Sequence, residues 1–185
     1  MASEKATGTA KVTAMSFHFS SFLTVHVGPE DSQQEFLLHE GIICARSDFF
    51  RRAMNGNWAE KTERLIKLPE DGPETFDIYV NLVYTNTISM LCLTRDLSPE
   101  RVKDKFQILV QLYILAEKLR DSRAKNDTIS VIHGLSYDNI RDGKTLPEGR
   151  AIQTMYDGTP EGSLGRSLLV DLWWAVGTKE IIEDS

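Results

Sequence analysis

Cysteine and histidine are too few and too scattered in this 185-residue sequence for a disulfide framework or a metal site. Its two cysteines, Cys44 and Cys92, both lie in apolar stretches, where a free cysteine behaves as a small hydrophobe. No histidine has a second histidine or a cysteine at metal-ligand spacing. The four histidines are His18, His26, His39 and His133. We therefore expect a protein of a reducing compartment that holds no metal.

Long apolar runs and clusters of basic residues are also missing. No stretch approaches the roughly 18 apolar residues of a membrane span, and the N-terminus lacks the apolar segment of a signal peptide. The net charge is −6, and the 21 lysines and arginines are dispersed, whereas a nucleic-acid binder should carry a basic patch. These absences predict a cytoplasmic or nuclear protein that binds neither membrane nor nucleic acid.

The first 40 residues contain the pattern of a tail followed by a hairpin. Residues 1–15 are small and polar, as in disordered tails. Residues 23–27 alternate apolar and polar side chains, which is typical of a half-buried strand. A turn signal follows at residues 28–32, and residues 35–38 return as the partner strand.

Helical spacing begins at His39, where the apolar residues change from a period of two to one of three or four. Ser47 stands at the cap position of a second short helix, which Asn55-Gly56 should end because both residues tolerate positive φ. Residues 65–68 are expected to form a third strand. Proline at the first helical position then predicts a buried helix from Pro73.

The rest of the chain is expected to be mostly helical. Residues 88–93 are apolar enough for a further strand. Residues 97–101 are expected to form a solvated loop, with Ser98 as a plausible helix cap. Residues 106–119 form an amphipathic pattern, and 123–132 a shorter helix. The expected solvent-facing side of the amphipathic helix is Lys103, Asp104, Lys105, Glu117 and Lys118. Few strands and several helices, segregated along the chain, predict the α+β class.

The C-terminal part is expected to form two more helices around one turn. The first is predicted over residues 146–157 and the turn over 157–163, with Ser163 as the cap of the last helix. Its apolar stripe is expected to be Leu164, Leu168, Leu169, Leu172, Trp173 and Val176. Trp173 and Trp174 are adjacent, so they cannot face the same direction on a helix, and one of them is a candidate for an exposed contact.

Three motifs, in order and at fitting spacing, resemble the BTB/POZ domain family. They are Phe36-x-x-His39-x-x-Ile42-x-x-Ala45-x-Ser47-x-Phe49-Phe50, then Ile66-x-Leu68-Pro-Glu-Asp-Gly-Pro-Glu-Thr-Phe76, and then Val83-Tyr-Thr85. The resemblance implies the α+β BTB/POZ fold, a small and mostly antiparallel sheet with a cluster of helices. We predict a BTB/POZ domain over residues 16–133 and a helical extension over 134–185. The wording of the motifs is most similar to the stand-alone BTB proteins of filamentous fungi.

Membership of that family implies homo- or hetero-oligomerisation through a protein interface. In the family, the first motif helix and the strand before it often form a two-fold interface, which here implies Phe22, Ile42, Ile43 and Arg46. The alternative for Ile42 and Ile43 is that they belong to the core, because helix faces pack inward by default. Many animal members carry an aspartate where Phe22 stands, so the charged dimer pocket of the transcription-factor type is not expected here.

The alternative function that the family implies is substrate adaptor of a cullin-based ubiquitin ligase. The implied partner surface is residues 90–106 together with the corner formed by Tyr84, Thr85 and Asn86. An adaptor also needs a substrate-binding module, and no stretch resembles a Kelch, MATH or zinc-finger domain. Residues 146–174, with Trp173 as the contact candidate, are the remaining region for that role.

An enzyme is not expected from these residues. Cys44 and His39 are five apart, which places them on different faces of a continuous helix, and an apolar setting should raise the pKa of the cysteine. His39 is more simply explained as a hydrogen-bonded histidine at a helix start. The acidic pairs 30–31 and 70–71 lie in turns rather than in a pocket that separates their pKa values. We therefore predict no catalytic residue, no cofactor and no small-molecule substrate.

Overall fold

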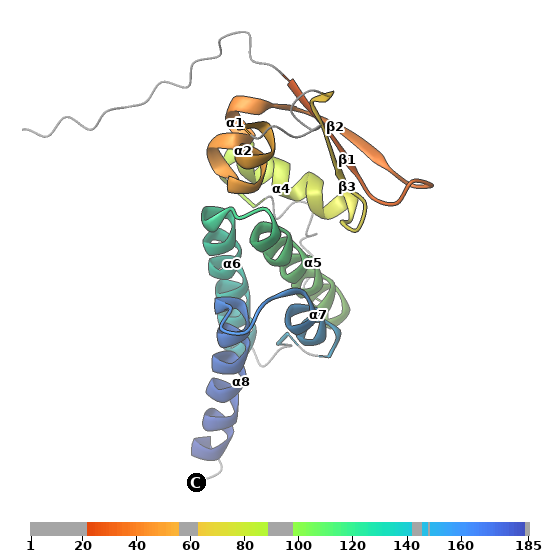
Figure 1. The fold of residues 1–185 in the computed structure, drawn as a ribbon. Helices are drawn as coiled ribbons and strands as arrows, with labels where there is room; N and C mark the ends of the chain where they lie inside the picture. Colours follow the sequence, from red (N-terminus) through yellow and green to blue (C-terminus); the bar gives the residue numbers. More distant parts are fainter. Residues whose placement is uncertain (1–21, 56–62, 89–97, 142–145, 148, 184–185) are drawn as a thin grey trace, which may run out of the picture.

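A three-stranded sheet and seven helices make up the part of the chain that the structure describes (Figure 1). The structure is a computed structural model, and it describes residues 22–55, 63–88, 98–141, 146–147 and 149–183. No helix within these ranges is long and apolar enough to cross a membrane. The predicted strand at 88–93, except for Ile88, lies outside the described residues, and so do residues 56–62 and Cys92.

The sheet has the strand order β2-β1-β3 and buries one face. β1 (Phe22–Val27) pairs antiparallel with β2 (Gln34–His39) and parallel with β3 (Leu65–Leu68). The predicted alternation is confirmed: Leu23, Val25 and Val27 are fully buried, while the residues between them are not. Gly28 follows the last residue of β1 and has φ +98°, a conformation that glycine adopts without strain.

The two short helices after β2 follow the predicted local signals. α1 (Glu40–Arg46) begins directly after His39, and α2 (Asp48–Asn55) follows after one residue. The Oγ atom of Ser47 accepts a hydrogen bond from the Phe50 N–H at 3.2 Å, so Ser47 is the predicted cap. The same hydroxyl donates to the Leu119 carbonyl at 2.6 Å, which fastens α2 to the helices that come much later in the chain.

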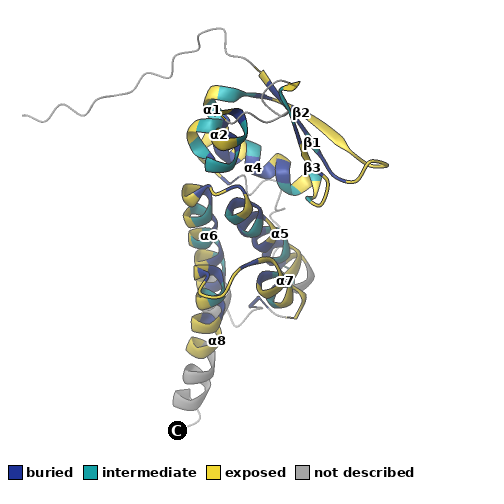
Figure 2. Cartoon of the chain, in the orientation of Figure 1, coloured by how far each residue is buried: buried dark blue, intermediate teal, exposed yellow. Residues whose placement is uncertain are grey.

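Three helices pack against one another beside the sheet: one lies next to the sheet, and the other two pack against that helix and against each other, farther from the sheet (Figure 2). α4 (Pro73–Thr85) begins at the predicted proline and buries most of its apolar residues. α5 (Pro99–Lys118) begins at Pro99, earlier than the predicted loop would allow, with Ser98 at its N-cap. α6 (Ser122–Arg141) is twice as long as the predicted helix over 123–132. The interior helix α5 contacts α4, α6 and α7.

Lys105 contradicts the predicted solvent-facing side of α5. It is 4% exposed, whereas Lys103 and Asp104 are exposed as expected. The reason is helical geometry, because Lys105 lies three residues after Val102 and four before Leu109. Both of these are fully buried, so the lysine shares the face that they turn toward the core.

The C-terminal extension consists of two helices joined by a tight turn. α7 (Arg150–Gly158) begins after Pro147, so the prediction that the proline lies inside this helix was wrong. α8 (Leu164–Glu183) follows Ser163 as predicted. A side chain on Gly165 would place its Cβ 2.6 Å from the Sδ of Met155, so glycine allows α8 to start close against α7. α8 then extends past the other helices (Figure 1).

The buried stripe of α8 differs from the predicted one. Leu169 and Leu172 are almost fully buried and Leu168 partly, but Leu164 is 60% exposed. The chain leaves the turn at Leu164, so the first residue of the helix lies beyond the surface that α7 offers. Val176 lies where the structure describes the backbone alone.

Candidate protein-interaction site

An aromatic cluster joins the start of β1 to the ends of β2 and α4. The ring centroid of Phe22 lies 4.8 Å from that of His39, which lies 5.9 Å from that of Tyr84. The Tyr84 hydroxyl accepts a hydrogen bond from the backbone N–H of His39 at 3.0 Å and lies 3.0 Å from its Nδ1 atom. Phe22 is nevertheless 47% exposed and Tyr84 39%. We call Phe22, His39 and Tyr84 the aromatic patch.

His39 is thus the hydrogen-bonded histidine at a helix start that the sequence indicated. It is the N-cap residue of α1, with an extended backbone, and its imidazole makes no cap hydrogen bond. The ring instead packs between Phe22 and Tyr84. Its position holds two exposed aromatic rings from separate elements in one place.

The two isoleucines of the predicted interface occupy different environments. Ile43 is fully buried and belongs to the core, whereas Ile42 is partly buried and packs against the core from outside. Ile43 therefore offers no surface to a partner, and the core interpretation applies to it. Ile42 retains some exposed surface at the start of α1, next to the aromatic patch in sequence.

Arg46 is mainly committed to contacts within the chain. Its Nε atom lies 3.2 Å from Oδ2 of Asp121, and its side chain is 13% exposed. Asp121 is 1% exposed, accepts a hydrogen bond from the Ala124 N–H at 2.9 Å, and accepts another from the Tyr79 hydroxyl at 3.3 Å. Burial and the neighbouring carboxylate both raise the pKa of Tyr79 far above its ordinary value, so its proton stays in place to be donated. We call Arg46, Tyr79 and Asp121 the buried polar network.

The corner at the end of α4 is exposed and ordered by hydrogen bonds. Asn86 adopts the left-handed conformation at φ 56°, and its Oδ1 accepts a hydrogen bond from Nη1 of Arg46 at 3.0 Å. The Thr85 hydroxyl donates to the Asn81 carbonyl at 2.7 Å. Tyr84, Thr85 and Asn86 are all exposed at this corner, whereas residues 90–97 of the same predicted surface lie outside the described residues.

The two tryptophans of α8 both reach the surface. The Nε1 of Trp173 donates to the Pro147 carbonyl at 2.8 Å, and this side chain is 43% exposed. Trp174 is 73% exposed, so it offers more contact surface than the residue that the sequence suggested. Which tryptophan is more exposed depends on which face of α8 is buried. That face cannot be identified from residue spacing alone, because the helix is apolar on most sides.

Hydrogen bonds from the Arg166 side chain stabilise the turn before α8. The Arg166 side chain donates to the carbonyl of Tyr156 at 2.6 Å, to the hydroxyl of Thr159 at 3.0 Å and to the Thr159 carbonyl. It also lies 4.9 Å from the ring centroid of Tyr156. This role of Arg166 was not predictable from the sequence, because a single arginine in a helix carries no pattern that reveals its acceptors.

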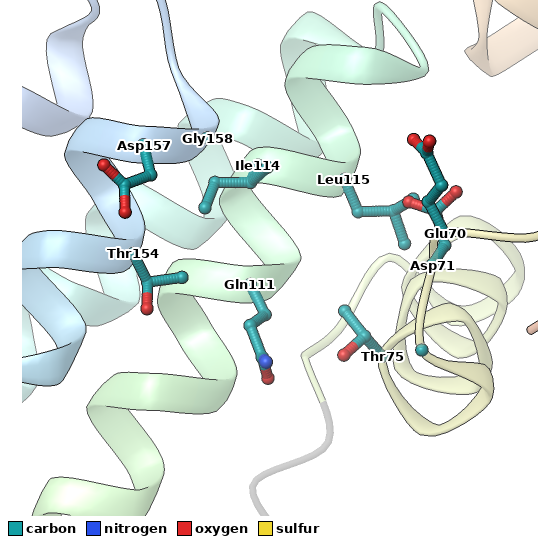
Figure 3. Close-up of a pocket in the computed structure, with 10 residues that line it drawn as sticks. Glu70, Asp71, Thr75, Gln111, Ile114, Leu115, Thr154, Asp157 and Gly158 are labelled. Carbon is teal, nitrogen blue, oxygen red and sulfur yellow. The ribbon is translucent and has the colours of Figure 1, made fainter.

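A hollow between the β3–α4 turn, α5 and α7 is lined mainly by acidic and neutral polar side chains. It has a volume of about 400 Å³ and is lined by three carboxylates, two threonines and one glutamine, with no histidine or cysteine among the lining residues. Figure 3 shows Glu70, Asp71 and Thr75 on one side and Thr154 and Asp157 on the other. The Nζ of Lys118 lies 2.7 Å from Oδ2 of Asp71, so this carboxylate already has a cationic partner.

Cys44 does not have the properties of a nucleophile. Burial raises the pKa of its thiol to about 11, and the nearby Glu40 carboxylate adds to the shift. The hydrogen-bond partner of the His39 ring is Tyr84. No group of three or more potential ligands among histidine, cysteine, aspartate and glutamate gathers within the described residues.

We expect Cys44 to react slowly with iodoacetamide. A pKa of about 11 in place of 9.0 lowers the thiolate fraction near pH 8 by about 100-fold. A Cys92→Ser variant isolates the residue. Its alkylation rate in native buffer should fall below that in urea by at least this factor, as measured by mass spectrometry over time. Equal rates in the two conditions would show that the thiol is ionised or exposed in the native protein.

Comparison with known proteins gives one family. The model of the BTB/POZ domain matches residues 15–122 of the chain, which is more than half of its length. A search of curated proteins gave no significant match. The matched range runs from before β1 to the first residue of α6, and it includes the aromatic patch, the buried polar network and the α4 corner.

Proposed function

The chain belongs to the BTB/POZ domain family, and on that premise we propose that it is a non-catalytic protein-interaction module that self-associates through the aromatic patch and the adjoining exposed side of Ile42. The family is one of protein–protein interaction modules. Its finer subtype, the stand-alone BTB protein of filamentous fungi, remains a prediction from the motifs.

The observation that carries this proposal is the exposure of two aromatic rings that are already held in place. Aromatic residues are enriched in protein interfaces, and binding costs less when their side chains are ordered beforehand. The His39 ring and its hydrogen bond to Tyr84 order both neighbours in the unbound chain. With Ile43 buried and Arg46 largely committed to Asp121 and Asn86, the aromatic patch is the part of the predicted interface that remains free to bind.

We expect the Phe22→Glu variant to lose self-association. A glutamate there would place a charge against apolar surface of the second copy, and central interface residues contribute about 2 kcal/mol or more, which is roughly 30-fold in affinity. Light scattering of the full chain over a range of concentrations measures the change. Tyr137→Glu is the matched control, since Tyr137 is 62% exposed on α6 and lies outside the patch.

The control separates a specific interface from general stickiness. Loss of association in the Phe22 variant with normal association in the Tyr137 variant supports the proposal. Equal association in both variants and the wild type would place the interface elsewhere. Circular dichroism on each variant verifies that the fold persists, as expected for substitutions at exposed positions.

The adaptor alternative is supported by the exposed and ordered corner at Thr85 and Asn86. A cullin N-terminal domain added to the same light-scattering experiment tests it. A defined complex that a Thr85→Arg substitution abolishes would assign the adaptor role. A chain that ignores the cullin domain and still self-associates supports the oligomerisation module.

A further inference from the structure

β2 is an edge strand whose outer side meets no other strand among the described residues. The strand order β2-β1-β3 leaves it with one partner. Edge strands are commonly protected against further pairing by lysine, proline or a bulge. The sequence of β2, Gln34 to His39, contains neither lysine nor proline, and its register with β1 runs without interruption over six residue pairs, so no bulge protects it.

The hydrogen-bonding alternation of the sheet identifies which backbone groups point outward. In an antiparallel pair, facing residues alternate between those that exchange two hydrogen bonds and those that exchange none. The N–H of His39 binds the Tyr84 hydroxyl instead of its register partner Phe22. The N–H of Thr24, two residues further along β1, binds the Arg64 carbonyl on the β3 side. The pairs Thr24–Leu37 and His26–Glu35 therefore leave the backbone groups of Glu35 and Leu37 pointing outward.

One end of this edge is closed by a side chain, and the other end meets no strand in the part of the chain that the structure describes. The Tyr84 hydroxyl takes the place of an incoming carbonyl at His39. Leu37 and Glu35 form the open part, with Leu37 61% exposed and the Glu35 side chain 67% exposed. Two residues with outward N–H and C=O groups offer up to four backbone hydrogen bonds to an added strand.

We propose that the open edge of β2 binds an extended segment of a partner protein by strand addition, with a basic residue beside Glu35 and an apolar residue beside Leu37. The alternating side chains of an added strand would place these two residues two positions apart on the outer face. Glu30 and Asp31 are exposed in the turn that leads to β2. These carboxylates and Glu35, whose Oε2 lies 3.2 Å from the Nε2 of His26, give the open end a negative charge that selects the basic residue.

The test uses a synthetic pentapeptide, acetyl-Thr-Arg-Val-Ile-Thr-amide, and the full chain labelled with nitrogen-15. Arginine and isoleucine stand two apart, and in an antiparallel addition, in which facing residues exchange both hydrogen bonds, their backbone groups are the ones that would face β2. We expect the amide signals of Glu35 and Leu37 to shift as the peptide is added. Methylation of the isoleucine nitrogen should weaken binding by at least about tenfold, because it removes a donor from a buried position.

Two matched controls make the result specific. Methylation of the valine nitrogen, which would point away from β2, should leave affinity within a few-fold. The Glu35→Lys variant should bind the arginine peptide more weakly and should bind a peptide with glutamate in place of arginine more tightly. These opposite responses cannot come from nonspecific adhesion of an apolar peptide.

Three results would overturn the proposal. The first is no shift of the two amides at millimolar peptide. The second is equal weakening by both methylations. The third is a shift of the same amides with protein concentration in the absence of peptide, because a second copy of β2 would then be the occupant of the edge. Phe22→Glu does not alter the backbone of Glu35 or Leu37, so the peptide result stands whether or not the aromatic patch mediates self-association.

Discussion

Replacing Asp121 by alanine is expected to lower the free energy of unfolding by about 3–5 kcal/mol, because removal of one member of a buried ion pair leaves the other charge uncompensated. Asp121 is 1% exposed and neutralises Arg46, whose side chain is 13% exposed. The substitution also removes the acceptor for the Ala124 N–H at the start of α6. Urea denaturation monitored by circular dichroism measures the change.

Asp127→Ala is the matched control on the same helix. The Oδ2 atom of Asp127 lies 3.9 Å from the Nε of Arg123 in an i,i+4 ion pair at the surface. Such pairs contribute at most about 0.5 kcal/mol to the free energy of unfolding. If Asp121→Ala lowers the free energy of unfolding by no more than the control does, the buried polar network adds nothing to stability. A cost in the expected range would show that α1, α4 and α6 depend on one another through Arg46, Tyr79 and Asp121.

Ile43→Glu is expected to prevent cooperative folding. The side chain is fully buried in the core, and a carboxylate there has to lose its hydration without a partner. The expected cost, above about 5 kcal/mol, is comparable to the whole stability of a small domain. The variant should show no cooperative transition in a thermal melt followed by circular dichroism.

Ala45→Glu separates this effect from the general cost of a charge on α1. Ala45 is exposed on the same helix. The free energy of unfolding of its variant should therefore stay within about 0.5 kcal/mol of the wild-type value. If Ile43→Glu instead gives a folded monomer with a normal melt, Ile43 lies at an interface, and the core assignment is wrong.

Local signals predicted the N-terminal half of the fold well. The alternation in β1, the cap at Ser47 and the proline at the start of α4 each depend on residues adjacent in sequence. Such features are determined by backbone chemistry within one turn or one strand. The family motifs fall in the same region, so the resemblance and the local patterns predicted the same elements.

Features that depend on contacts between distant segments were not predictable in the same way. The outward position of Leu164 follows from where the neighbouring helix α7 lies. The partners of Arg46 come from residues 40 and 75 positions later in the chain. The exposure of Leu37 had a signal, since it lies between Phe36 and Leu38 in a half-buried strand, but three consecutive apolar residues conceal the alternation.

Hydrogen–deuterium exchange at low and high protein concentration tests the central claim most directly, because it maps the surface that self-association covers. We predict slower exchange at the higher concentration in peptides spanning residues 22–27 and 80–88, which contain Phe22 and Tyr84, and unchanged exchange in α8. Exchange that does not depend on concentration anywhere, or that slows in α8 alone, would contradict an interface at the aromatic patch.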